Sequence, residues 1–211
     1  MATDALDAPP VPRHRRAEER ALDAAKACCE KWGVSRVTVD DIAAEAGLSR
    51  ATLYRLFPGG KDVLFEALRV RELNEFLDEL SAHIKGLTTI EDLLVAAVSF
   101  ATQALRDDPH LALMMAAEPG EVLANFTVDG LPRILRQVSE HLLQFVEPHL
   151  GHDDAVAVLE VVTRLVISCF LSPSELVDFG DEASARAFLS TLLPRVFVRD
   201  TTDLTHPGGA S

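Results

Sequence analysis

The sequence has few cysteines, few aromatic residues and no excess of positive charge. Its 211 residues include three cysteines, one tryptophan and one tyrosine. Cys28 and Cys29 are adjacent and cannot easily pair with each other, and an odd total does not suit the disulfide framework of a secreted protein. We therefore expect the reducing conditions of the cytoplasm.

Long hydrophobic runs are also missing. The longest apolar stretch, residues 155–171, is interrupted by Glu160 and Arg164, whereas a membrane-spanning helix needs about 20 predominantly apolar residues. The N-terminus, MATDALDAPPVPRHRR, lacks the apolar core of a signal peptide. These absences predict a soluble protein with no membrane partner. An apolar content of 48% excludes wholesale disorder.

The charge is unevenly distributed along the chain. Lys and Arg number 20 against 33 Asp and Glu, a net charge of −13 that by itself argues against nucleic acid as a partner. Residues 13–61, however, carry ten basic and seven acidic side chains, and residues 73–211 carry eight basic and 21 acidic ones. The acidic excess therefore belongs to the C-terminal part, and the N-terminal part remains a candidate for binding DNA.

Apolar residues recur with helical period almost throughout, and we find no convincing alternating strand. The sequence predicts an all-α fold, with a disordered lead at 1–12 and a flexible tail at 200–211. Thr38 with Asp41, and Thr88 with Glu91, resemble capping boxes at helix starts, and Ser49 is a predicted N-cap. The expected helices are 16–32, 38–46, 49–57, 61–84, 88–106, 109–119, 122–150 (interrupted at 125–132), 153–171 and 181–198.

Two of the short helices form a helix-turn-helix pattern around Gly47. Ile42, Ala43 and Leu53 provide small apolar contacts that fix the crossing of the helices, and Gly47 permits a left-handed turn. The second helix presents hydroxyls, a methyl group, an aromatic ring and two arginines, a set that suits base edges and phosphates in a major groove. These side chains are Ser49, Arg50, Ala51, Thr52, Tyr54 and Arg55.

The stretch TVDDIAAEAGLSRATLYRLFP at 38–58, followed by KDVLF at 61–65, resembles the N-terminal domain of the TetR family of bacterial transcriptional repressors. The resemblance covers about residues 16–69. It implies a helix-turn-helix DNA-binding domain at 13–61 and a ligand-binding and dimerisation domain at 62–199. The turn at 58–60 is one residue longer than the commonest family form, and Cys29 stands where the family often has Phe.

The resemblance also implies roles for individual residues. Thr38 and Lys61 correspond to phosphate contacts, and Tyr54 lies near the DNA backbone. Arg50, Ala51 and Arg55 occupy the sequence-reading face. The basic cluster at 13–16 precedes the first expected helix, either as a mobile arm that follows DNA or as a solvated tail. The candidate DNA contacts are Arg36, Thr38, Ser49, Arg50, Ala51, Thr52, Tyr54, Arg55 and Lys61.

The C-terminal part is rich in aliphatic, Phe and Met residues, which make either an ordinary core or, as the resemblance implies, an inducer-binding unit. Such a lining favours an apolar ligand such as a fatty acid or hydrocarbon. Arg133, Arg136 or Arg164 suits an acidic head group, and His110, Asn125 or Gln144 a neutral polar one. The candidate ligand-binding residues are Phe100, Leu111, Met114, Met115, Phe126, Leu135, Arg164 and Phe170.

The helices expected at 153–171 and 181–198 are apolar on more than one face, so they need a second burial partner. The resemblance implies a homodimer through these two helices. If Arg164 is buried in this apolar run, it needs an acidic partner or a ligand.

The sequence therefore predicts a homodimeric, ligand-responsive repressor. Its two recognition helices would enter major grooves about 34–36 Å apart on a near-palindromic operator. The alternative is a DNA-binding regulator that is controlled by a protein partner and takes no ligand. We find no G-x-S-x-G elbow, metal motif or phosphate loop, so we expect neither an enzyme, such as a lipid-handling hydrolase, nor a cofactor.

Overall fold

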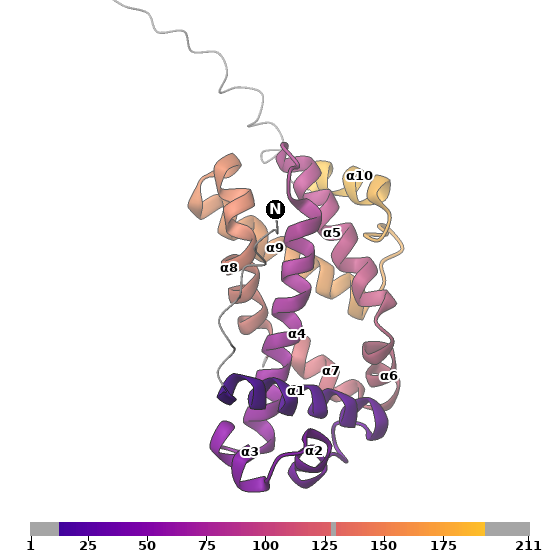
Figure 1. Cartoon of the computed structure of the whole chain (residues 1–211). Coiled ribbons are helices and arrows are strands. Elements are labelled where there is room, and N and C mark those ends of the chain that lie inside the picture. Colours follow the sequence, from indigo (N-terminus) through magenta and orange to yellow (C-terminus); the bar gives the residue numbers. More distant parts are fainter. Residues whose placement is uncertain (1–12, 128–129, 193–211) are drawn as a thin grey trace, which may run out of the picture. The chain divides into compact units, whose positions relative to one another are not determined.

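The fold is built from α-helices throughout the part of the chain that the computed structural model describes, residues 13–127 and 130–192 (Figure 1). Two compact units divide the chain at Glu72 and Leu73, within helix α4. The prediction of an all-α fold is confirmed. The helices of the described residues are α1 (Arg13–Trp32), α2 (Val39–Ala46), α3 (Arg50–Leu56), α4 (Lys61–Ile84), α5 (Ile90–Asp107), α6 (Pro109–Ala117), α7 (Pro119–Phe126), α8 (Leu131–Leu150), α9 (His152–Leu171) and α10 (Glu182–Leu192).

Small apolar side chains close the core of the N-terminal unit. Ile42, Ala43 and Leu53, which we expected between the helices of the motif, are buried in one cluster. Leu64 and Leu68 of α4 belong to the same cluster. The start of α4 is therefore part of this core, although the predicted domain boundary after residue 61 precedes both leucines.

The helix α1 begins earlier than predicted and ends at Trp32, as predicted. It begins at Arg13, so the basic residues 13–16 lie in its first turn rather than ahead of it, because no glycine or proline interrupts this run of helix formers. Trp32, whose helical spacing from Cys28 and Cys29 predicts a place on the inner face of α1, is instead 40% exposed. The Lys31 ammonium lies 4.8 Å from its ring centroid. Cys29 is itself buried, so the core closes without the indole.

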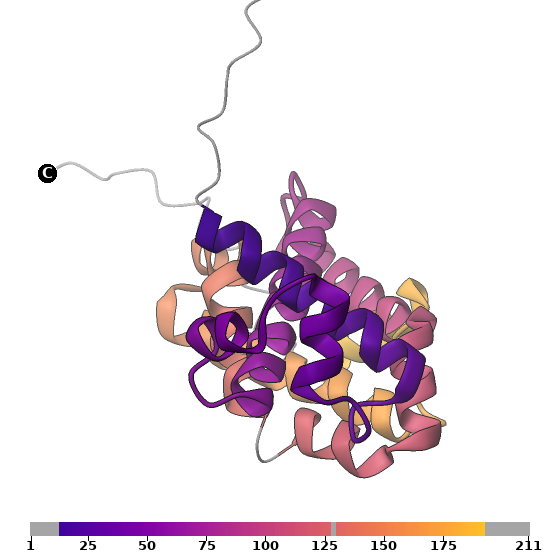
Figure 2. The same cartoon turned by 60° about the horizontal axis from the view of Figure 1, so that its bottom comes forward.

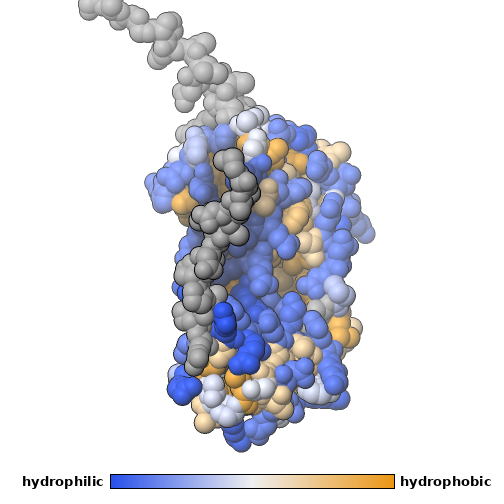
Figure 3. Space-filling model, viewed as in Figure 1, coloured by the Kyte–Doolittle hydropathy of each residue, from blue (hydrophilic) through white to orange (hydrophobic). Residues whose placement is uncertain are grey.

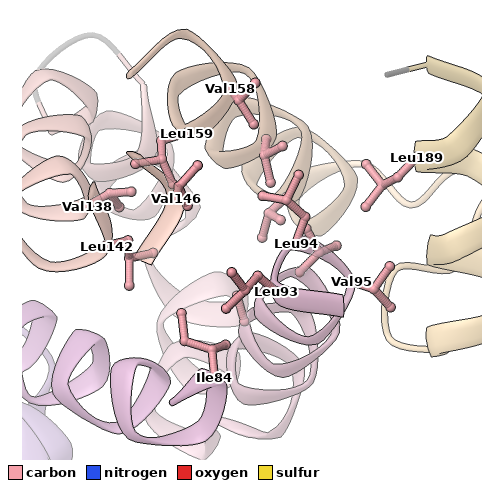
Figure 4. Close-up of a cluster of buried hydrophobic side chains, with 14 of the residues drawn as sticks. Ile84, Leu93, Leu94, Val95, Val138, Leu142, Val146, Val158, Leu159 and Leu189 are labelled. Carbon is pink, nitrogen blue, oxygen red and sulfur yellow. The ribbon is translucent and has the colours of Figure 1, made fainter. Parts of the chain in front are cut away.

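One hydrophobic cluster joins the helices of the C-terminal unit. Its helix α9 packs against both α8 and α5, and α10 packs against α5. Figure 4 shows side chains converging from α4, α5, α8, α9 and α10. The labelled residues are Ile84, Leu93, Leu94, Val95, Val138, Leu142, Val146, Val158, Leu159 and Leu189.

The cap of α5 lies one residue later than predicted. Thr89, not Thr88, is the N-cap, and its side chain accepts a hydrogen bond from the Asp92 amide. Both threonines have an acid three residues on, so the local pattern fits either. Arg186 of α10 donates to Asp92 at 2.8 Å and to Glu91 at 2.7 Å. Asp92 therefore has two roles: its amide takes part in the cap of α5, and its carboxylate binds Arg186 of α10.

The stretch between α5 and α8 also departs from the prediction. We expected one helix to end near residue 119 and the next to begin at residue 122, but α7 begins at Pro119. Proline fits the first position of a helix because its fixed φ is helical and its missing N–H needs no partner there. The helix α7 ends at Phe126 and α8 begins at Leu131, and both bounds lie within the predicted interruption at 125–132.

Three predictions fall on residues outside the described part of the chain: the disordered lead at 1–12, the tail at 200–211, and the continuation of the last helix to residue 198. Among the helices that are described, none combines the length and apolar character needed to cross a membrane.

Candidate nucleic-acid interface

Thr38 and Asp41 fix the start of α2. The Asp41 amide donates to the Thr38 hydroxyl at 3.2 Å, and the Thr38 amide donates to the Asp41 carboxylate at 2.9 Å. The Thr38 hydroxyl also donates to this carboxylate at 2.6 Å. These bonds from Thr38 lower the pKa of Asp41. The predicted capping box is confirmed, and it holds Thr38 in an exposed position at the helix N-terminus.

The turn between α2 and α3 depends on Gly47 and Ser49. Gly47 has a φ of +61°, the left-handed conformation that glycine adopts most readily. The Leu48 amide donates to the Ala43 carbonyl at 2.9 Å, which ends α2. Ser49 then caps α3 by accepting from the Thr52 amide at 3.1 Å. The prediction that Gly47 makes the turn and Ser49 opens the second helix is confirmed.

The helix α3 has one buried and one exposed face. Leu53 is 1% exposed and anchors the helix in the core of the N-terminal unit. Arg50, Ala51, Tyr54 and Arg55 are exposed, on a short helix whose position the caps and Leu53 determine. Figure 2 gives a second view of this unit, with α1 to α3 in indigo to violet.

Arg50 has two partners within the protein. Its Nη1 atom lies 3.2 Å from the Asp40 carboxylate of α2, and its guanidinium carbon lies 5.7 Å from the centre of the Tyr54 ring. A hydrogen bond with Tyr54, and then the charge of Asp40, raise the pKa of Arg50, so the guanidinium stays protonated. No sequence pattern links Asp40 to Arg50, because the two residues are ten positions apart and belong to different helices.

Lys61 also has partners within its own unit. Its ammonium donates to the Val34 carbonyl at 2.7 Å and lies 3.5 Å from the Ser35 carbonyl. The same group lies 5.4 Å from the centre of the Phe65 ring. The side chain therefore ties the first residue of α4 to the turn between α1 and α2. The phosphate contact that we predicted for Lys61 would have to coexist with these bonds or replace them.

The longer turn before α4 brings Gly60 close to the recognition helix. Gly60 is buried with a φ of +73°, and a Cβ atom placed there would lie 3.2 Å from Cε1 of Tyr54. The extra glycine therefore lets the backbone support the Tyr54 ring. Arg36, another candidate contact, is exposed in the turn between α1 and α2.

The candidate ligand-binding residues are only partly brought together. The rings of Phe126 and Phe170 approach each other, with centroids 5.6 Å apart. Phe100 instead packs with Phe76 and His83 at centroid distances of 6.1 and 4.8 Å. The remaining apolar candidates, Leu111, Met114, Met115 and Leu135, are half-buried on α6 and α8.

Arg164 does not meet the condition of burial under which it would need an acidic partner or a ligand. Half of its side chain is exposed, and it donates twice to Glu160, one turn earlier on α9, at 2.8 and 3.0 Å. The pair forms because residues four apart on a helix share a face. A ligand head group at Arg164 would therefore compete with Glu160.

The helices predicted to form a dimer carry apolar side chains beyond those in the core. Val158, Val162 and Val166 of α9 are buried, while Val161 is 43% exposed on another side of the same helix. Leu192 of α10 is 47% exposed. Figure 3 shows mostly hydrophilic residues on one face of the molecule, with hydrophobic residues reaching the surface in several places.

Two known regulators resemble this chain over most of its length. An uncharacterized HTH-type transcriptional regulator of Mycobacterium tuberculosis (strain ATCC 25618 / H37Rv) is 26% identical over 177 residues, 82% of this chain and 82% of that protein. The HTH-type transcriptional repressor KstR of Rhodococcus jostii (strain RHA1) is 28% identical over 152 residues, 71% of this chain and 69% of that protein.

The family and fold comparisons agree with these relatives. The family model described as bacterial regulatory proteins, tetR family, matches residues 21–68. The crystal structure of the TetR-family repressor AlkX from Dietzia sp. strain DQ12-45-1b, implicated in biodegradation of n-alkanes, matches with a TM-score of 0.62 and 22% identity. The match covers 85% of this chain and 94% of that one. The predicted class, a transcriptional regulator, is confirmed, because the family model describes regulatory proteins and the two relatives are a transcriptional regulator and a transcriptional repressor.

Proposed function

Because this chain belongs to the TetR family of bacterial regulatory proteins, we propose that it is a homodimeric transcriptional repressor whose release from DNA is controlled by a small lipophilic ligand. Regulators of this family bind DNA and act as dimers. The proposed target is a near-palindromic operator in the bacterial cytoplasm. Residues 13–61 are assigned to DNA binding and residues 62–199 to ligand binding and dimerisation.

The exposed face of α3 carries the proposal. A capped helix anchored by one buried leucine presents two guanidinium groups, hydroxyls, a methyl group and a phenol to solvent. Arginine can donate two parallel hydrogen bonds to guanine, and a methyl group suits thymine. The proposed contacts are Ser49, Arg50, Ala51, Thr52, Tyr54 and Arg55 from α3 and its cap, with Arg36, Thr38 and Lys61 at the phosphates.

The distribution of charge supports the same interface. The basic excess in residues 13–61 attracts the DNA backbone, and the acidic excess in residues 73–211 repels it. Contact would then be restricted to the N-terminal units of the dimer. In a dimer with the proposed symmetry, the two α3 helices would bind half-sites about 34–36 Å apart.

The apolar residues of the C-terminal unit support a lipophilic ligand. The ring of Phe126 on α7 packs against that of Phe170 on α9. On α6, Leu111, Met114 and Met115 are half-buried. Apolar and flexible side chains of this kind suit an acyl or alkyl chain. Release of DNA requires the ligand to bind more tightly to the conformation that does not bind the operator, because equal affinity for both conformations shifts nothing.

Selection of DNA by the full-length protein tests this function. We expect the protein to enrich a near-palindromic sequence from a library of random 30-bp duplexes, and to sediment as a dimer at micromolar concentration. Hexadecanoic acid or n-hexadecane should then weaken binding to the enriched duplex. Enrichment of no sequence would refute DNA recognition. Enrichment without an effect of either lipid would favour control by a protein partner.

A further inference from the structure

The ion pair between Asp40 and Arg50 joins the two helices of the motif on its solvent side. The Nη1 atom of Arg50 lies 3.2 Å from Oδ2 of Asp40, with the two side chains 62% and 64% exposed. Asp41, the next residue along α2, is bound to Thr38 in the capping box. Of the two adjacent carboxylates, Asp40 is therefore the one directed to the recognition helix.

The ring of Tyr54 is a second contact that restricts the position of the Arg50 guanidinium. The guanidinium carbon of Arg50 lies 5.7 Å from the ring centre of Tyr54, a distance at which cation and ring attract each other. The ring is itself supported by the close backbone at Gly60. Arg50 is thus placed by a carboxylate on α2 and a ring on its own helix before any DNA is bound.

We propose that Asp40 is a specificity-determining residue that positions Arg50 for bases and disfavours its use on phosphates. This inference rests on the proposed function, DNA binding through α3. A guanidinium has five N–H donors, so one bond to Asp40 leaves enough donors for a bidentate contact with guanine. The operator complex can therefore retain the ion pair.

A complex with unrelated DNA has the opposite requirement. Without a matching base, Arg50 gains most by turning to a phosphate, and that movement breaks the pair and leaves the Asp40 carboxylate facing a polyanion. Asp40 should then weaken non-specific binding more than specific binding. Exposed ion pairs add little to folding stability, so the expected effect is on selectivity.

The experiment compares Asp40→Asn with a variant of equal charge. Glu45→Gln removes one negative charge from the exposed surface of the same helix, five residues further along. Affinities are measured by fluorescence anisotropy of the full-length protein at 150 mM KCl. The probes are the duplex most enriched by the wild type from a random 30-bp library and a duplex of the same composition in permuted order.

We expect Asp40→Asn to lower the ratio of specific to non-specific affinity about 5- to 10-fold, chiefly through tighter binding of the permuted duplex. Glu45→Gln should leave that ratio within about 2-fold of the wild type, because the lost negative charge strengthens electrostatic attraction to both duplexes equally. In an Arg50→Ala background, Asp40→Asn should no longer change the ratio. Asp40→Ser, which keeps a polar residue in the first turn of α2, should reproduce Asp40→Asn.

Three outcomes would overturn the inference. Equal changes in the ratio for Asp40→Asn and Glu45→Gln would reduce Asp40 to a general surface charge. If Asp40→Asn lowered the affinity ratio as much in the Arg50→Ala background as in the wild type, Asp40 would not act through Arg50. A wild type that enriches no sequence would refute DNA recognition, and the inference with it, whereas the first two outcomes leave DNA recognition intact.

Discussion

At the scale of single residues, the side chains around α3 differ in how firmly the protein already holds them. The Ser49 hydroxyl accepts from the Thr52 amide and lies 2.9 Å from the Thr52 hydroxyl, so both oxygens have partners in the absence of DNA. Ala51 offers only a methyl group. Substitutions on this helix will therefore change the internal contacts of the motif together with its contacts to DNA.

Lys61 provides a test that separates these two effects. Lys61→Ala removes the bonds from the ammonium to the Val34 and Ser35 carbonyls, and we expect it to lower the free energy of unfolding by about 1–2 kcal/mol. If the amine also contacts a phosphate, the slope of log affinity against log salt should become shallower by about one unit. Urea denaturation and anisotropy titrations over a range of KCl concentrations measure the two effects.

Lys31→Ala is the matched control for this variant. Lys31 is an exposed lysine near the end of α1, and its ammonium lies over the Trp32 ring rather than at backbone carbonyls. It should lose less stability than Lys61→Ala. An unchanged salt slope for Lys61→Ala would remove Lys61 from the proposed phosphate contacts and leave it as a residue that holds the turn.

At the scale of helices, local chemistry is what the sequence predicts well. The Thr38 cap, the Gly47 turn and the Ser49 cap each depend on residues within five positions of one another, and all three are confirmed. The pairing of Asp40 with Arg50 and of Lys61 with Val34 joins residues ten and 27 positions apart. Such contacts depend on how helices pack, so no local pattern predicts them.

The errors have the same origin. Thr88 and Thr89 both precede an acid at the spacing of a capping box, and the choice of Thr89 goes together with Arg186, almost a hundred residues away. The largest missed core residue is Phe179, which is 1% exposed although it lies in the connection between α9 and α10. Its ring packs edge-on against Phe188, a contact that helical periodicity cannot indicate.

The turn at Gly47 yields a prediction about conformation alone. Gly47→Ala should destabilise the protein by about 1 kcal/mol, because alanine is strained at a positive φ, whereas a Cβ atom at this position would meet nothing within 4 Å. Gly120→Ala is the control: Gly120 lies in α7, and its added Cβ would also meet nothing. That variant should gain up to about 1 kcal/mol from helix propensity. Urea denaturation of both variants checks the opposite signs.

The attachment of α10 to α5 predicts a dependence on pH. Hydrogen bonds from Arg186, and then from Thr89, lower the pKa of Asp92. A carboxylate whose pKa is lower in the folded state stabilises the fold above its unfolded pKa of about 3.9 and loses that contribution as the pH falls through the folded value. Arg186→Gln should therefore lose about 1 kcal/mol at pH 7 and progressively less toward pH 3, as measured by denaturation.

The control for this variant is Arg136→Gln, which removes one positive charge from an exposed position of α8. It should change stability less than Arg186→Gln at pH 7. A loss in Arg186→Gln that stays constant from pH 7 to pH 3 would contradict the role assigned to Asp92, because the loss would then have to come from contacts that do not titrate.

At the scale of the whole molecule, the proposed function needs two copies of the chain. Val161→Glu places a charge on the exposed side of α9, and we expect it to convert the dimer to a monomer and to reduce operator affinity more than 10-fold. Sedimentation velocity and anisotropy measure these changes. Leu113→Glu alters a residue of α6 that is 52% exposed, and it should leave the dimer intact. A Val161→Glu protein that still sediments as a dimer would exclude α9 from the interface.

The bond from Lys61 to the Val34 carbonyl also limits how this protein can be dissected. A fragment that ends with the recognition helix would lose that bond together with Leu64 and Leu68, which complete the hydrophobic cluster of the N-terminal unit. An N-terminal unit that is transferred to another regulator would therefore need the chain through at least Leu68. In chimaeras joined within α4 beyond this point, the C-terminal unit can be exchanged, and the N-terminal unit should keep its fold.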